Sequence, residues 1–167
     1  MKKIVFSGFI LFILALIFKA AAQENVKLAD DVKIDKIEIL KAQRKMNVYQ
    51  NGKLLKTYKI ALGTNPVGPK EVQGDGKTPE GKYKVDGKNP HSKFYKNLGV
   101  SYPNADDKAR AKKLGLPPGG DIKIHGTGRG VPFIPGDWTL GCIAVTNEEI
   151  DELYEHTPVG AEIEIKP

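Results

Sequence analysis

The chain has 167 residues, a length that suits a single domain with a short appendage. Hydrophobic residues make up 40% of it and charged residues 28%, so a packed core is expected and the composition does not indicate a disordered chain. The single Cys excludes an internal disulfide and any CxxC site for zinc or redox chemistry. The net charge of +6 includes only three Arg, which argues against nucleic-acid recognition through bidentate Arg contacts.

Residues 1–22 predict a signal peptide. Two Lys at positions 2 and 3 precede the apolar run Ile4–Phe18, and three consecutive Ala ending at Ala22 fit an A-x-A cleavage site. The run is shorter than the roughly 20 residues that a membrane-spanning helix needs. We expect cleavage near Ala22 and export to the periplasm or cell envelope. The alternative is an uncleaved signal anchor, which Lys19 would suit.

Cleavage at that point would lower the net charge from +6 to +3, because residues 1–22 hold three Lys and no acidic residue. A charge of +3 is too weak to suggest a polyanionic partner. An exported protein is also not expected to carry out nucleotide-dependent chemistry. We therefore expect neither a nucleic acid nor a nucleotide among the partners of the chain.

A short polar leader is predicted over residues 23–35, followed by one domain over 36–167. Near the start of this domain, apolar and polar residues alternate on both sides of Asn51-Gly52. Asn-Gly between two alternating runs is a strong signal for a β-hairpin with a type I′ turn.

Two short helices are predicted from their first residues. Asn104 is followed by acidic residues, and Thr146 has Glu149 three positions later, as in a capping box. Strands are expected over residues 36–41, 45–50, 53–61, 82–85, 121–125, 140–145 and 161–165. The expected fold is mostly β, an antiparallel β-sandwich or barrel-like sheet with the two helices packed outside.

Cys142 and His125 are candidates for nucleophilic catalysis. His125 ends a predicted strand, and a Gly-rich loop joins it to the strand that carries Cys142. Neighbouring strands would bring imidazole and thiol together, and an imidazole that draws off the thiol proton yields the nucleophilic thiolate. The backbone amides of Gly141 and Cys142 could then form an oxyanion hole. The alternative is an inert, buried Cys in an apolar strand.

The same stretch resembles the signature of the L,D-transpeptidase catalytic domain family (YkuD-like), in which His-Gly is followed, after a loop, by Ser/Thr-x-Gly-Cys and an apolar strand. Here the motif reads His125-Gly126 and then Thr139-Leu140-Gly141-Cys142. Weaker matches follow in the family's order at residues 51–52, 61–63, 78–81 and 101–104, and residues 137–149 resemble its stand-alone periplasmic branch.

The resemblance covers about residues 36–165, with two departures from the commonest pattern. Leu140 stands where many members have His, and Ala144 stands where many have Arg. Both departures make the immediate surroundings of the Cys less polar, while His125 and Cys142 are kept. The resemblance therefore implies a thiol mechanism and leaves the acceptor open.

The resemblance implies that the protein acts on peptidoglycan stem peptides. Cys142 would attack the carbonyl of the third residue, a diamino acid, and form a thioester as D-alanine leaves. His125 would act as base and then acid, with the Gly126 carbonyl orienting its imidazole. An acceptor amine would complete a cross-link or a link to a wall protein. If water takes its place, the enzyme is an L,D-carboxypeptidase or amide hydrolase, and a third alternative is a non-catalytic peptidoglycan-binding module.

Four further residues are candidates for substrate binding, each with a structural alternative. Arg129 could pair with a stem carboxylate or be a solvated loop residue. Trp138 could line the donor groove or anchor the core. Thr139 could steady the site through its hydroxyl or be an ordinary strand residue, and Tyr102 could reach the site or pack in the core. No cofactor is expected, and the three scattered His give no metal-site spacing.

Overall fold

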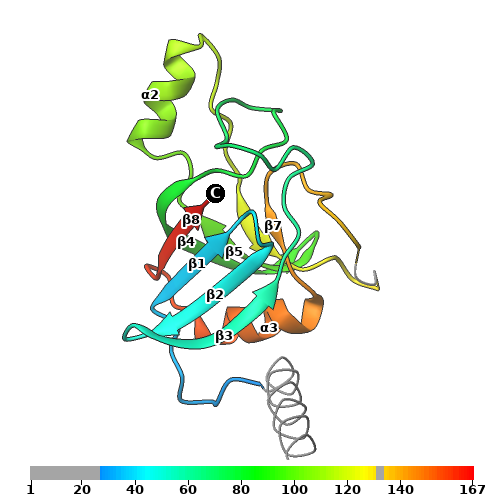
Figure 1. Ribbon diagram of the computed structural model, residues 1–167. Helices are drawn as coiled ribbons and strands as arrows, with labels where there is room; N and C mark the ends of the chain where they lie inside the picture. The colour runs from blue at the N-terminus through cyan, green and yellow to red at the C-terminus, as the bar shows by residue number, and fades with distance from the viewer. Residues whose placement is uncertain (1–26, 131–133) are drawn as a thin grey trace, which may run out of the picture.

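The computed structural model describes residues 27–130 and 134–167 (Figure 1). The predicted signal peptide over residues 1–22 lies outside the described residues. In the described ranges, no helix has both the length and the apolar character needed to cross a membrane.

One curled, eight-stranded sheet forms the body of the protein, in the order β3-β2-β1-β8-β4-β5-β6-β7 (Figure 1). The strands are β1 (Lys36–Leu40), β2 (Lys45–Gln50), β3 (Lys53–Lys59), β4 (Gly81–Ser92), β5 (Tyr95–Val100), β6 (Lys123–His125), β7 (Ile143–Ala144) and β8 (Glu162–Lys166). Five neighbouring pairs are antiparallel, while β1–β8 and β6–β7 are parallel. The mostly-β prediction is confirmed, with a mixed sheet in place of a purely antiparallel one.

The first hairpin forms where the sequence predicts it. Ile37 and Ile39 of β1 are fully buried and alternate with partly exposed residues, so one face of the strand meets the core. Asn51 and Gly52 have φ values of +51° and +76°, as a type I′ turn requires at both central positions. This turn sets the pairing of β2 with β3.

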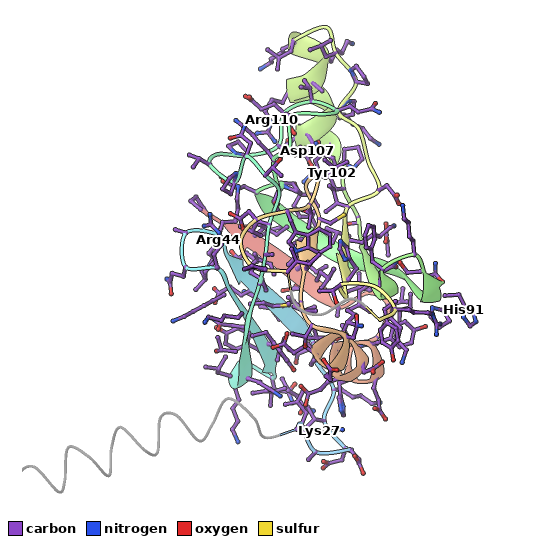
Figure 2. All side chains as sticks on the ribbon, turned by 90° about the vertical axis from the view of Figure 1, so that its right-hand side faces the viewer. Lys27, Arg44, His91, Tyr102, Asp107 and Arg110 are labelled. Atoms are coloured by element: carbon purple, nitrogen blue, oxygen red, sulfur yellow. The ribbon has the colours of Figure 1, made fainter. Side chains whose placement is uncertain are left out.

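The two predicted helices are present in the described residues as α2 (Ala105–Lys113) and α3 (Asn147–His156), and both begin with a capping box. α3 packs its buried Ile150 and Leu153 into the core, whereas α2 extends away from the sheet (Figure 1). Asp107, at the base of α2, accepts a hydrogen bond from the Tyr83 hydroxyl at 2.9 Å. Figure 2 shows Asp107 and Arg110 together above Tyr102 at that base.

The second half of the sheet departs most from the prediction. β4 continues to Ser92, seven residues beyond the predicted end, and β5 was not predicted at all. Residues 86–97 contain Gly, Asn, Pro and Lys, which favour loops, and irregular pairing interrupts this hairpin at two places. β5 nevertheless lies between β4 and β6, and so it positions the strand that ends in His125.

Part of the predicted leader packs on the domain. Ile34 is fully buried and belongs to the hydrophobic core. Further towards the N-terminus, the Leu28 amide donates to the Glu152 carboxylate of α3, and His156 Nδ1 lies 2.9 Å from the Val32 carbonyl oxygen. Residues 28–34 are therefore held against α3.

Candidate active site

His125 and Cys142 lie on one face of two adjacent strands. β6 pairs with β7 in parallel, with Ile124 opposite Ile143 and His125 opposite Ala144. Cys142 comes immediately before β7 and two residues before Ala144, so the alternation of side chains puts it on the face that carries His125. Both residues also line the same two cavities. The structure thus brings together the two candidates for acid–base and nucleophilic chemistry.

The His125 imidazole is held in one orientation and one tautomer. Its Nδ1 lies 2.6 Å from the Gly126 carbonyl oxygen, which can only accept, so Nδ1 carries the proton and Nε2 carries the lone pair. Phe94 stacks on the ring at 4.6 Å, and Trp138 meets it at 5.7 Å at a steep angle. Burial lowers the pKa of His125, and the hydrogen bond to the Gly126 carbonyl opposes this shift without reversing it. The resting imidazole is therefore a neutral base.

The Cys142 thiol is also uncharged at rest. Its Sγ lies 3.6 Å from the Asp121 carbonyl oxygen, to which the S–H donates. Burial raises the pKa of the thiol, while a backbone hydrogen bond with Lys123 opposes that rise. With a raised thiol pKa and a lowered imidazole pKa, the neutral pair is the resting state, and the thiolate forms only as His125 takes the proton.

Thr139 fixes the turn that carries the cysteine. Its hydroxyl donates to the Cys142 carbonyl oxygen at 2.7 Å and accepts from the Gly141 amide at 3.1 Å. The Gly141 amide, predicted for an oxyanion hole, therefore already has an acceptor within the turn. Of the two predicted amides, that of Cys142 remains as the candidate donor to an oxyanion.

Arg44 and Asp137 support this turn from outside. The Arg44 guanidinium donates hydrogen bonds to the Asp137 carboxylate from Nε and from Nη2, with Nη2 2.7 Å from Oδ2. The other carboxylate oxygen, Oδ1, accepts from the Leu62 amide at 2.9 Å, and the Leu62 carbonyl accepts from the Thr139 amide at 3.1 Å. This support cannot be predicted from the sequence, because 93 positions separate Arg44 from Asp137 and no local pattern links them.

Two cavities of about 450 Å³ and 640 Å³ meet at the catalytic pair. Four residues line both of them: Phe94, Asp121, His125 and Cys142. Phe94 and Asp121 were not among the predicted site residues. Both come from stretches without a recognisable catalytic pattern, and only the folding of β5 and β6 places them here.

The first cavity is the more apolar of the two. Trp138 and Thr139, both predicted for substrate binding, line it, together with Leu140, a residue that is 83% exposed. Lys70 also lines this cavity, and its ammonium is held by Asp75 at 2.7 Å. Lys70, which lies in the Gly/Pro-rich stretch after β3, was not among the predicted site residues.

The other two predicted binding residues lie elsewhere. Tyr102 is buried in the hydrophobic core, where its hydroxyl donates to the Pro118 carbonyl at 2.9 Å, and it does not line either cavity among the described residues. Arg129 is exposed, with its guanidinium 5.7 Å from the centre of the Tyr95 ring. Neither is brought into contact with Cys142.

The two positions that depart from the commoner family pattern differ in their surroundings. Leu140 is exposed at the edge of the first cavity, whereas Ala144 is buried in a backbone bridge with Ala61. Elsewhere in the described ranges, no three His, Cys, Asp or Glu residues gather closely enough to hold a metal ion.

Comparison with known proteins identifies the family of the chain. The family described as the L,D-transpeptidase catalytic domain, YkuD, matches residues 34–165. The chain belongs to this family. It is 34% identical over 125 residues to the Escherichia coli protein named "Putative L,D-transpeptidase YafK", covering 71% of this chain and 45% of that protein. The chain therefore spans less than half the length of this relative.

Solved structures share the fold. The crystal structure of the helical cell shape determining protein Pgp2 from Campylobacter jejuni superposes with a TM-score of 0.64 at 26% identity, over 91% of this chain and 54% of that one. An L,D-transpeptidase from Xylanimonas cellulosilytica gives a TM-score of 0.56 at 13% identity, over 91% and 69%. The latter likeness concerns the fold alone.

Proposed function

We propose that this protein is a peptidoglycan L,D-transpeptidase with Cys142 as nucleophile and His125 as general base. The observation that carries the proposal is the position of this pair, on one strand face at the meeting point of two cavities. Two cavities give room for two peptides, one that donates an acyl group and one that accepts it. The proposed site of action is the periplasm or cell envelope, after cleavage of the signal peptide near Ala22.

In the first half-reaction, the donor peptide occupies one cavity with the carbonyl of its third residue against Cys142. His125 Nε2 takes the thiol proton as Sγ attacks, and the Gly126 carbonyl, bonded to Nδ1–H, stabilises the imidazolium that forms. The Cys142 amide donates to the oxyanion. His125 then gives its proton to the leaving nitrogen, so D-alanine departs and a thioester remains.

In the second half-reaction, an acceptor amine attacks the thioester from the other cavity. His125 takes a proton from the nitrogen and returns it to Cys142 Sγ as the C–S bond breaks. The product is an amide, either a cross-link between stems or a link to a wall protein. Water in the place of the amine would make the same site an L,D-carboxypeptidase or amide hydrolase.

The second cavity favours transfer over hydrolysis, because attack by water needs no binding site of this size beside the thioester. The presence of both His125 and Cys142 on one face disfavours the non-catalytic binding module, which would have no need of the pair. Such a module would bind peptidoglycan equally well after Cys142→Ala.

The test is to incubate residues 23–167 with purified disaccharide-tetrapeptide muropeptides and to identify the products by mass spectrometry, beside the Cys142→Ala variant. We expect a dimer formed with loss of one D-alanine, and none with the variant. Tripeptide as the sole product would replace transfer by hydrolysis. The absence of any Cys142-dependent product would count against this donor and favour cleavage or attachment of a wall-linked protein.

A further inference from the structure

Asp121 occupies the boundary between the two cavities. It lines both of them, and its side chain is 91% exposed. Among the described residues that line either cavity, it is the only acidic one. A cationic group that approaches Cys142 from either side therefore meets this carboxylate.

The backbone of Asp121 ties this carboxylate to the nucleophile. Its φ is +60°, in the left-handed region that Asp and Asn tolerate better than other residues with a side chain. In this conformation, its carbonyl oxygen lies 3.6 Å from Cys142 Sγ. One residue thus holds the thiol through its backbone and presents its side chain to solvent beside it, with Oδ1 3.3 Å from Lys123 Nζ.

The second cavity is also lined by basic residues. Lys93 and Lys123 line the cavity, together with His91, which Figure 2 shows at the outer tip of the β4–β5 hairpin. Lys88 lines it too, but its ammonium is bonded to two backbone carbonyl oxygens at the end of α3. A ligand that carries both an ammonium and a carboxylate would match this arrangement, whereas an ammonium alone would meet a surplus of positive charge.

We infer that Asp121 receives the ammonium group of the acceptor, a primary amine that also bears a carboxylate, in the second cavity. The inference rests on the proposed transfer function. The docked ammonium releases one proton to solvent, and the neutral nitrogen attacks the thioester carbonyl as the C–S bond breaks. His125 moves the second proton from nitrogen to Cys142 Sγ, so the products are an amide, a thiol and one proton. Asp121 concentrates and orients the amine and exchanges no proton.

Asp121→Asn is the variant that tests this role, because Asn tolerates the same φ and has nearly the same shape without the charge. Three acceptors, compared at pH 8, distinguish the contribution of the acceptor's ammonium from that of its carboxylate. Glycine carries both groups, ethylamine carries only the ammonium, and hydroxylamine is uncharged. The donor is the tetrapeptide muropeptide, and release of D-alanine is followed separately from acyl transfer. Asp106→Asn, on the exposed face of α2, is the matched control.

We expect Asp121→Asn to raise the acceptor KM for glycine and for ethylamine about twofold to fivefold, the effect of losing one solvent-exposed charge pair. The rate with hydroxylamine should stay unchanged, and D-alanine release should not slow. Lys93→Gln should raise the KM for glycine but not for ethylamine. Asp106→Asn should change none of these values.

An unchanged glycine KM in Asp121→Asn, or an equal loss with hydroxylamine, would overturn the assignment. If the wild type releases D-alanine but transfers the acyl group to no amine, the proposed transfer function is wrong. An NMR titration then tests separately whether Asp121 binds an ammonium group. Glycine added to Cys142→Ala protein should produce saturable shifts at residues of the second cavity. The double variant Cys142→Ala/Asp121→Asn should not show those shifts. If it does show them, that result alone would overturn the assignment.

Discussion

The Thr139 hydroxyl donates to the backbone carbonyl of Cys142 at 2.7 Å and at the same time accepts from the Gly141 amide at 3.1 Å. One side chain thus closes the turn on both sides of the nucleophile. Thr139 is only 4% exposed, so water cannot readily replace these bonds. The position of Sγ relative to His125 depends on this turn.

Thr139→Val removes both bonds with little change of volume. We expect it to lower the free energy of unfolding by about 1–3 kcal/mol, since two buried groups lose their partner. D-alanine release should slow about tenfold to a hundredfold, because the nucleophile is no longer held. Denaturant unfolding and a D-alanine assay measure the two effects. Thr57→Val, at an exposed hydroxyl bonded to Asn47, is the control; equal behaviour of both variants would contradict the role of Thr139.

Arg44→Lys tests the outer support of the same turn. Lys cannot bind Asp137 through two nitrogens, so the segment before Thr139 should be held less firmly. The rate of D-alanine release should therefore fall several-fold. The loss of stability should stay below about 1 kcal/mol, because the Arg44 side chain is 37% exposed and water screens the pair. Lys36→Gln breaks the similarly exposed Lys36–Glu164 pair far from the site and should leave the rate unchanged. A wild-type rate in Arg44→Lys would refute the support.

The pH dependence follows from the lowered pKa of His125 and the raised pKa of Cys142. Acylation needs a neutral imidazole, so kcat/KM should decline only as the pH falls through a value below the ordinary 6.5 of histidine. Alkylation of Cys142 by iodoacetamide should be slow at pH 7 and rise above pH 9, since the thiolate forms late. Rapid alkylation that is independent of pH between 6 and 8 would instead reveal a resting thiolate–imidazolium pair.

Gly141→Ala should destabilise the protein by about 2–4 kcal/mol, because strained backbone and a steric clash add. The φ of Gly141 is +131°, and an added Cβ would lie 2.6 Å from the Lys77 carbonyl oxygen. Thermal unfolding measures the loss. Gly120→Ala, where an added Cβ meets nothing within 4 Å, serves as the control for stability and should stay close to the wild type. A Gly141→Ala protein as stable as the Gly120→Ala protein would show that the turn can relax.

Local signals allowed much of the fold to be predicted from the sequence. Asn51-Gly52 and the capping boxes at Asn104 and Thr146 act within a few residues of chain, so their geometry follows from the residues present. β5 could not be predicted, because its sequence has no clear alternation of apolar and polar residues and the strand is stabilised by pairing with β4 and β6.

For the candidate site too, the features set by local sequence could be predicted, and those set by distant contacts could not. The motif around His125 and Cys142 is visible in the sequence, and the structure places the two residues on one strand face. The Arg44–Asp137 pair cannot be predicted from the sequence, because it joins distant segments. Asp121 is invisible because its position depends on a left-handed backbone and on two cavities that exist only in the folded protein.

Trapping the acyl-enzyme tests the central claim most directly. Wild-type protein, mixed briefly with tetrapeptide muropeptide without acceptor and quenched in acid, should gain the mass of the muropeptide less D-alanine. Peptide mapping should place that mass on Cys142, and His125→Gln should form the adduct far more slowly. An adduct on another residue, an adduct that retains D-alanine, or product formation that persists in Cys142→Ala would contradict the account.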